Sequence, residues 1–279
     1  MLYDIAFLIF AIFYLPALLF KGKLHKDFLE RLGLYDRTAL ERLRDSASGT
    51  IWIQAVSVGE VALCRALIPL LKKEFQGKEI VLSTITKTGN DLARSIFSED
   101  AVIIYFPLDF SFIVKKAVGL IRPRIYIMIE TEIWPNLLAE LRANSIPSIL
   151  INGRISDRSF GKYKLAAPFL KNTLNRINLF CMQSEIDAER IKSLGAPAAR
   201  VSVTGNMKFD VETSRDMRGQ LEARRSLGLK DDEVLFVAGS THEGEEDIVL
   251  NVFKQLEPEF PKLRLVIAPR HIERAGEVE

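Results

Sequence analysis

Acidic side chains follow two of the most apolar segments of the chain. Glu60 closes the run Ile51–Glu60, which passes directly into a helical pattern, and Glu130 and Glu132 follow the run Ile125–Ile129. In an open α/β sheet, ligands bind beyond the carboxyl ends of the parallel strands. We therefore expect these three carboxylates at one rim, where neighbouring acids can shift each other's pKa for acid–base work.

The spacing around Glu60 also fits a purely structural role. Ser57 and Glu60 stand three residues apart at the predicted helix start. This is the spacing of a capping box, in which each side chain binds a backbone N–H. Glu130 and Glu132 do not have that spacing. Spacing alone therefore favours the cap for Glu60 and a functional role for Glu130 and Glu132.

Phosphate-binding chemistry is indicated further along the chain. Gly239–Gly244 follows an apolar run and opens a helical pattern, an arrangement that binds phosphate through free N–H groups. A plain Ser/Thr cap on a tight loop fits this stretch equally well. Arg270 follows the next apolar run, and its guanidinium group can donate two hydrogen bonds to a phosphate. Lys208 could add a positive charge, but it could equally be a solvated lysine of the linker. The candidate donor-binding residues are Lys208, Gly239, Ser240, Thr241, His242, Pro269, Arg270 and His271.

The elements that must position these residues alternate along the chain. Apolar, β-rich runs predict strands near 51–56, 79–84, 101–106, 124–129, 147–152, 178–182 and 201–204, with helical patterns between most of them. This alternation predicts a parallel sheet with helices on both faces. After a polar linker, the pattern predicts a helix near 215–227, a strand at 234–238, a helix from about 245 and a strand at 263–268.

Six short motifs, in order along the whole chain, resemble the 3-deoxy-D-manno-octulosonic acid (Kdo) transferase family. The motifs are Ala55–Glu60, Glu130–Asn136, Asn152–Ser156, Gly205–Phe209, Gly239–His242 and Ala268–His271. The resemblance implies an α/β protein with two Rossmann-like, doubly wound domains of the glycosyltransferase B type. It also implies an inverting transferase that moves Kdo from CMP-Kdo to the lipid A precursor in lipopolysaccharide biosynthesis, with no metal or other cofactor.

Carried over to this chain, the resemblance assigns Glu60 as the base and Glu130 as a second acidic position. Ser57, Gly59, Glu132 and Arg154 then belong to the acceptor side. The resemblance predicts a glycine-rich strand-turn-helix region after His271, which this sequence does not contain. We therefore expect the second domain to be incomplete, and we expect this chain on its own not to complete the transfer.

Composition and charge limit the other functions. With 279 residues we expect about two domains, 27–205 on the acceptor side and 206–279 as linker and partial donor domain. Basic and acidic residues nearly cancel, 38 against 36, which argues against a nucleic-acid binder. The two cysteines indicate buried thiols in a reducing compartment rather than a disulfide framework. Two alternatives stay open: a UDP-sugar transferase or epimerase of the same fold, and a non-catalytic, membrane-anchored acceptor-binding module.

Residues 1–26 are predicted to form a single membrane anchor. The stretch Ile5–Phe20 has no charged residue, and Lys21, Lys23 and Lys26 follow it. Its length is close to the ~20 residues of a spanning helix. The lysines would hold the rest of the chain on the cytoplasmic face of the inner membrane, in contact with its lipids. A signal peptide would carry its basic residues before the apolar run, whereas a buried helix stays possible.

Overall fold

The computed structural model describes residues 3, 4, 8, 26–46, 48–210, 217–230 and 232–278. The chain divides into two compact units, Met1–Glu212 and Thr213–Glu279. Each unit is described by itself below.

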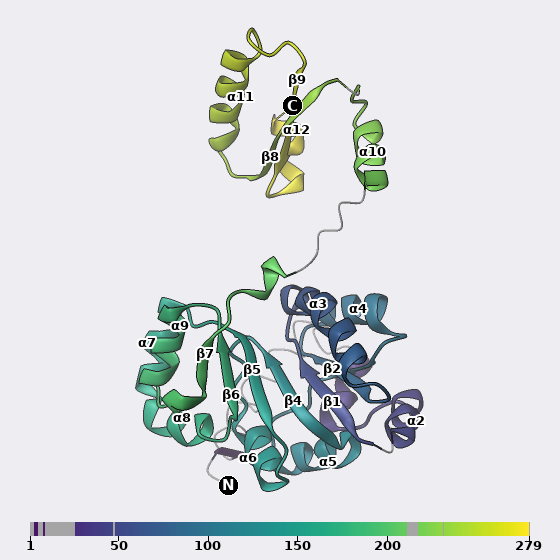
Figure 1. Cartoon of the computed structure of the whole chain (residues 1–279), viewed down its shortest axis with the longest axis vertical. Coiled ribbons are helices and arrows are strands. Elements are labelled where there is room, and N and C mark those ends of the chain that lie inside the picture. Colours follow the sequence, from purple (N-terminus) through teal and green to yellow (C-terminus); the bar gives the residue numbers. More distant parts are fainter. Residues whose placement is uncertain are drawn as a thin grey trace. The chain divides into compact units, whose positions relative to one another are not determined.

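The first unit is built on a parallel sheet, as the alternating pattern predicts (Figure 1). Its described strands are β1 (Thr50–Gln54), β2 (Glu79–Thr84), β3 (Val102–Tyr105), β4 (Pro123–Ile129), β5 (Ser148–Gly153), β6 (Leu179–Met182) and β7 (Val201–Val203). They lie in the order β3-β2-β1-β4-β5-β6-β7, and every pairing is parallel. The direction of strand order reverses between β1 and β4, which places the expected ligand crevice beyond their carboxyl ends.

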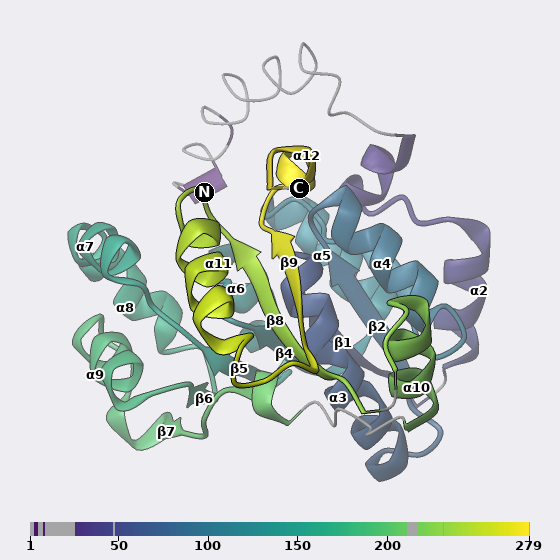
Figure 2. The same ribbon diagram turned by 90° about the horizontal axis from the view of Figure 1, so that it is seen from above.

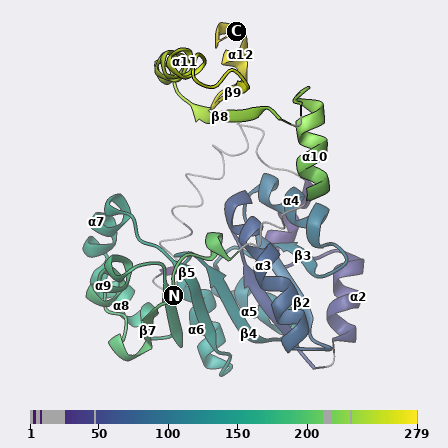
Figure 3. The same ribbon diagram turned by 45° about the horizontal axis from the view of Figure 1, so that its top comes forward.

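Helices cover both faces of this sheet. The described helices are α2 (Arg37–Asp45), α3 (Val58–Glu74), α4 (Lys87–Phe97), α5 (Ser111–Ile121), α6 (Pro135–Ala143), α7 (Asp157–Leu165), α8 (Ala167–Leu174) and α9 (Glu185–Ser193), with short 3-10 turns η1 (Lys26–Leu32), η2 (Ala198–Arg200) and η3 (Met207–Phe209). Figure 3 shows α3 and α4 together next to β2, and α7, α8 and α9 together near β7.

Two apolar clusters hold these layers together because successive strand residues point to opposite faces. Ile51 and Ile53 pack with residues of α3 and α4, whereas Trp52 packs with residues of α2, α5 and α6 on the other face. All five residues of β1 are buried. The nearly continuous apolar character of β1 and β4 follows from this two-sided burial.

The second unit contains one strand-helix-strand motif. Its described elements are α10 (Met217–Ser226), β8 (Val234–Thr241), α11 (Glu245–Leu256), β9 (Leu263–Pro269), η4 (Ile272–Arg274) and α12 (Ala275–Val278). Strands β8 and β9 pair in parallel, with Gly239 opposite Ala268 and Thr241 opposite Pro269. The helices and strands predicted for this part are confirmed, with β8 extending to Thr241.

Two predicted segments need separate comment. Most of the proposed anchor at 1–26 lies outside the described residues. In the described ranges, no helix combines the length and the apolar character needed to cross a bilayer. The motif Gly205–Phe209, which the sequence analysis assigned to the linker, makes its contacts within the first unit, where the Met207 amide donates to Asn152 Oδ1 at 3.1 Å.

Candidate active site

Glu60 lies in the first turn of α3, just beyond the carboxyl end of β1. Its carboxylate is held at two points: Oε2 accepts from the Val56 amide at 2.6 Å, and Oε1 accepts from the Ser57 hydroxyl at 3.1 Å. The residue is only 8% exposed. These two hydrogen bonds fix the direction of the carboxylate.

The capping-box interpretation of Ser57 and Glu60 is wrong in its details. Ser57 is the N-cap of α3, but its side chain accepts no hydrogen bond from the helix. The Glu60 carboxylate binds the amide of Val56 and not that of Ser57, as a box would require. The Ser57 hydroxyl instead donates to the carboxylate, so Ser57 orients Glu60.

Glu130 directly follows β4, and its backbone has a φ of +60°, in the left-handed region. For a residue with a Cβ this conformation costs about 1–2 kcal/mol, and such strain is concentrated at functional sites. The surrounding loop is fastened to the end of β5, because the Glu130 amide donates to Ile151 O at 2.9 Å and the Thr131 hydroxyl donates to Arg154 O. The neighbouring sheet therefore holds the turn that presents Glu130 and Glu132.

The electrostatics place Glu60, Glu130 and Glu132 in one group. Burial, with a smaller contribution from the Glu130 charge, raises the pKa of Glu60 to about 7. The hydrogen bonds from Val56 and Ser57 act in the opposite direction and lower this pKa. Burial and the charge of Glu60 raise the pKa of Glu132 to about 7, while the nearby Trp134 indole acts in the opposite direction. Two carboxyl groups that titrate near neutral pH can exchange protons with a bound hydroxyl group, which is the requirement of general acid–base chemistry.

Buried polar groups behind this cluster were not identified from the sequence. The hydroxyl of Tyr126 and the amide nitrogen of Gln54 are fully buried and have no hydrogen-bond partner among the described residues. Burial, followed by the charges of Glu132 and Asp109, raises the pKa of Tyr126 well above its usual value. Buried groups without partners are rare in folded proteins, and the Tyr126 hydroxyl lies close enough to Glu132 and Asp109 to be affected by their charges.

Asp109 is another residue that the sequence analysis missed. It is fully buried, and its carboxylate accepts from the amides of Asn136 (3.0 Å) and Leu137 (2.8 Å) at the start of α6. The N-cap residue of α6, Trp134, provides no side-chain cap. Asp109 therefore fixes the end of the loop that carries Glu132, and no local spacing in the sequence pointed to it.

The predicted acceptor-side residues reach the same rim from three elements. Ser57 and Gly59 lie at the start of α3, Glu132 lies in the loop after β4, and Arg154 follows β5 with an exposed side chain. Asn152, at the end of β5, was quoted only as part of a motif. It is 1% exposed with a φ of +54°, and it binds the Met207 amide.

The second unit brings most of the predicted donor-side residues together. The pairing of β8 with β9 places 239–241 beside 268–269, and the Arg270 amide donates to Thr241 O at 2.9 Å. Ser240 has a φ of +64°. Arg270 and His271 are exposed. Lys208 lies exposed in η3 of the first unit, and its donor-binding role stays a prediction.

The start of α11 is already occupied by side chains of the protein. The His242 amide donates to Glu245 Oε2 at 2.7 Å, and the Thr241 hydroxyl donates to Glu246 Oε1 at 2.8 Å. Arg274 also binds Glu246, at 3.2 Å. A phosphate at this helix start would have to replace these carboxylates, so phosphate binding by 239–242 stays a prediction.

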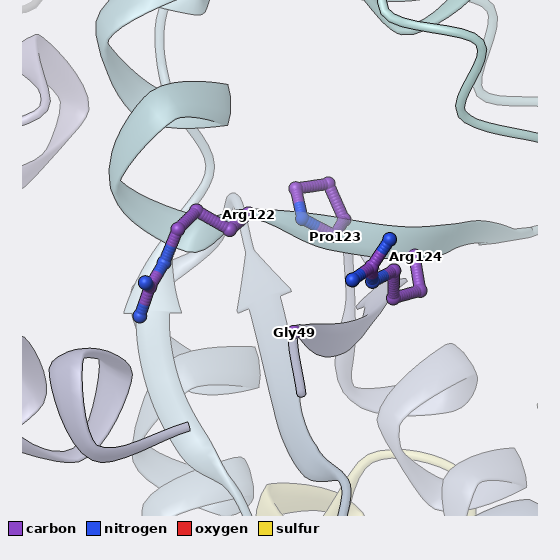
Figure 4. Close-up of a pocket in the computed structure, with 4 residues that line it drawn as sticks. All are labelled: Gly49, Arg122, Pro123 and Arg124. Atoms are coloured by element: carbon purple, nitrogen blue, oxygen red, sulfur yellow. The ribbon is translucent and has the colours of Figure 1, made fainter. Parts of the chain in front are cut away.

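Two further features lie away from the carboxylate group. A shallow hollow of about 200 Å³ lies at the amino ends of β1 and β4, which is the opposite end of these strands from the carboxylates (Figure 4). It is lined by Gly49, Arg122, Pro123 and Arg124. In the described part of the chain, no group of three or more His, Cys, Asp or Glu side chains is arranged to hold a metal ion.

Comparison with known proteins agrees with this geometry. The family model for 3-deoxy-D-manno-octulosonic-acid transferase (kdotransferase) matches residues 26–211. The 3-deoxy-D-manno-octulosonic acid transferase of Haemophilus influenzae is 34% identical over 224 residues, which cover 80% of this chain and 52% of that protein. The protein of the same name from Chlamydophila psittaci is 32% identical over 284 residues, covering 100% of this chain and 64% of the relative. The chain thus spans between half and two thirds of the length of these relatives.

Solved structures support the predicted fold. The UDP-GlcNAc 2-epimerase of Neisseria meningitidis bound to UDP-GlcNAc matches with a TM-score of 0.54 at 13% identity, covering 78% of this chain and 64% of that one. This likeness confirms an α/β fold of the glycosyltransferase B type. The family model matches residues 26–211, more than half of the chain, and this match shows that the chain belongs to the 3-deoxy-D-manno-octulosonic acid transferase family.

Proposed function

We propose that the protein is an inverting glycosyltransferase that moves Kdo from CMP-Kdo to the lipid A precursor in lipopolysaccharide biosynthesis. Family membership supports the choice of reaction. The observation that carries the proposal is the group of carboxylates at the reversal of strand order, where two of them titrate near neutral pH. That is the chemistry which a sugar transfer to a hydroxyl group needs.

In this proposal Glu60 is the base. As the acceptor hydroxyl oxygen forms a bond to the anomeric carbon of Kdo, its proton passes to Glu60 and the bond to the CMP phosphate breaks. Burial gives Glu60 a pKa of about 7, so an ionised Glu60 is a stronger base than an ordinary carboxylate and is still available at neutral pH. The bonds from Val56 and Ser57 aim the carboxylate.

Glu130 and Glu132 complete the acceptor side of this site. The charge of Glu130 raises the pKa of both neighbours and so supports proton uptake by Glu60. Glu132, with its pKa of about 7, can hold a proton and donate a hydrogen bond to an acceptor oxygen. On the donor side, Arg270 would stabilise the charge that develops on the departing phosphate.

The proposal also includes a location. The sixteen uncharged residues Ile5–Phe20 and the lysines after them support an anchor on the cytoplasmic face of the inner membrane. Extraction of membranes at alkaline pH tests this. The protein should stay with the membranes, whereas a chain without Met1–Phe20 should be released; release of the intact chain would contradict an anchor.

A transfer assay tests the function. Since the chain spans only part of its relatives, the assay uses it extended by the part of the Chlamydophila psittaci relative that the match does not cover. Incubation with CMP-Kdo and lipid A precursor should yield a product heavier by one or more Kdo residues, detected by mass spectrometry. Replacing CMP-Kdo by UDP-GlcNAc should yield none. Conversion of UDP-GlcNAc, with no Kdo product, would contradict the proposal.

A further inference from the structure

Two large apolar side chains project from the helix pair α7–α8. Leu165, the last residue of α7, is 86% exposed, and Phe169 in α8 is 77% exposed. Figures 2 and 3 show α7 and α8 next to each other, on the same side of the first unit as α9. Isolated exposed apolar residues are common, but here two large ones lie four residues apart at one helix junction, and each would gain by transfer from water to an apolar environment.

The same segment carries a local excess of positive charge. Residues 154–176 contain six Lys or Arg residues and one acidic residue, a net charge of +5, whereas the whole chain has +2. The single acid, Asp157, is paired with Arg190. Lys162, Lys164 and Lys171 are exposed around Leu165 and Phe169 in sequence. The segment therefore presents apolar side chains within a positive field.

The packing of this segment is one-sided. No residue of α7 is fully buried, and the helix is held to the core through the partly buried rings of Phe160 and Tyr163. The Lys164 ammonium lies 4.7 Å from the centre of the Phe160 ring. The segment is thus attached through one side, which leaves Leu165 and Phe169 available to a partner.

The pair α7–α8 belongs to the same helix layer as α5 and α6. The Arg176 guanidinium, which follows α8, donates to Pro135 O at the start of α6 at 2.8 Å. Asp4 accepts from the Ser111 amide at 2.9 Å and from the Asn136 side chain at 2.8 Å, at the starts of α5 and α6. A residue of the proposed anchor segment is therefore fastened to the layer that carries Leu165 and Phe169.

We propose that α7–α8 is a second membrane contact, in which Leu165 and Phe169 enter the headgroup region of an anionic bilayer and Lys162, Lys164 and Lys171 bind lipid phosphates. Apolar side chains flanked by lysines are the composition of helices that lie in the membrane interface. Positive charge selects an anionic lipid surface over an apolar protein partner. The inference deepens the proposed membrane location and rests on it. It would hold the rim beside β5, from which α7 departs, close to lipid-borne acceptors.

Site-specific fluorescence on the full chain tests this contact. The two native tryptophans, Trp52 and Trp134, are fully and partly buried. A Phe169→Trp variant therefore adds a reporter at the proposed contact. Leu70→Trp is the matched control, because Leu70 is 64% exposed on α3, a helix that covers the other face of the sheet. Both variants are mixed with vesicles of phosphatidylglycerol and phosphatidylethanolamine that carry brominated acyl chains, which quench nearby tryptophans.

We expect the bromine to reduce the added emission of Phe169→Trp by at least about twofold and to leave that of Leu70→Trp unchanged. Combining Phe169→Trp with Lys164→Glu and Lys171→Glu should restore the emission. If the chain sediments with the vesicles but Phe169→Trp is not quenched, the anchor proposal stands and this second contact is refuted. Equal quenching at both positions would also refute it. A chain that does not sediment with the vesicles would refute both membrane proposals.

Discussion

Replacement of Glu60 by glutamine should make the first unit more stable, and increasingly so as the pH rises. The glutamine side chain has nearly the shape of a protonated glutamate, and its carbonyl oxygen can still accept from the Val56 amide. The wild-type carboxyl has its pKa raised from 4.5 to about 7 by burial, so between these values the folded chain holds a proton that the unfolded chain releases. Raising the pH through this window therefore favours unfolding of the wild type.

The magnitude follows from the size of the pKa change. One pH unit of differential proton binding corresponds to about 1.4 kcal/mol. Between about pH 5 and about pH 8 the wild type should lose roughly 2 kcal/mol through Glu60 that the Glu60→Gln variant keeps. Glu132, whose pKa is also about 7, lowers the free energy of unfolding with rising pH in both the wild type and the variant. The variant should therefore retain part of the pH dependence.

Urea unfolding followed by tryptophan fluorescence provides the assay. Trp52 and Trp134 are the tryptophans of the chain, and both belong to the first unit, so the signal reports on that unit alone. Glu74→Gln, an exposed position on the same helix, is the control and should follow the wild type at every pH. If the free energy of unfolding changes with pH in the same way for the wild type and Glu60→Gln from about pH 5 to about pH 8, the claim that buried Glu60 holds a proton in the folded state is refuted.

Two further predictions concern the supports of the site. Asp109→Ala leaves the Asn136 and Leu137 amides without their acceptor, and it should lower the free energy of unfolding by about 1–2 kcal/mol in the same urea assay; unchanged stability would show that α6 does not depend on it. Asn152→Gly tolerates the φ of +54° but removes the acceptor of the Met207 amide. Hydrogen exchange at that amide should rise about tenfold or more, and unaltered exchange would contradict this link.

The strands of the first unit could be predicted because burial on both faces leaves a clear apolar signal. The predicted strand 51–56 is β1 at Thr50–Gln54, and 124–129 is β4 at Pro123–Ile129. The parallel arrangement then predicted Glu60 and Glu130 at one rim, and the sheet order adds that β1 and β4 are neighbouring strands. The position of the carboxylates was therefore a consequence of the fold pattern.

Side-chain partners could not be predicted in the same way. The spacing of Ser57 and Glu60 fits a capping box, but the direction of the carboxylate is set by the Val56 amide and by surroundings from other strands. Asp109 binds the backbone amide of Asn136 at the start of α6, which lies 27 residues further along the chain. Such a contact exists only after the sheet has formed. Tyr126 lies within the predicted strand 124–129, and only the fold brings its hydroxyl near Glu132 and Asp109.

The pH dependence of Kdo transfer tests the central claim that Glu60 is the base. The extended chain described above is assayed with CMP-Kdo and lipid A precursor, and kcat/KM is measured from about pH 5 to about pH 9. Because only the ionised carboxylate accepts the proton, kcat/KM should rise with pH and level off above an apparent pKa of about 7. Glu60→Gln should lower it at least about a hundredfold at every pH, with the fold preserved. A variant that transfers Kdo at the wild-type rate with the same pH profile would contradict the assignment.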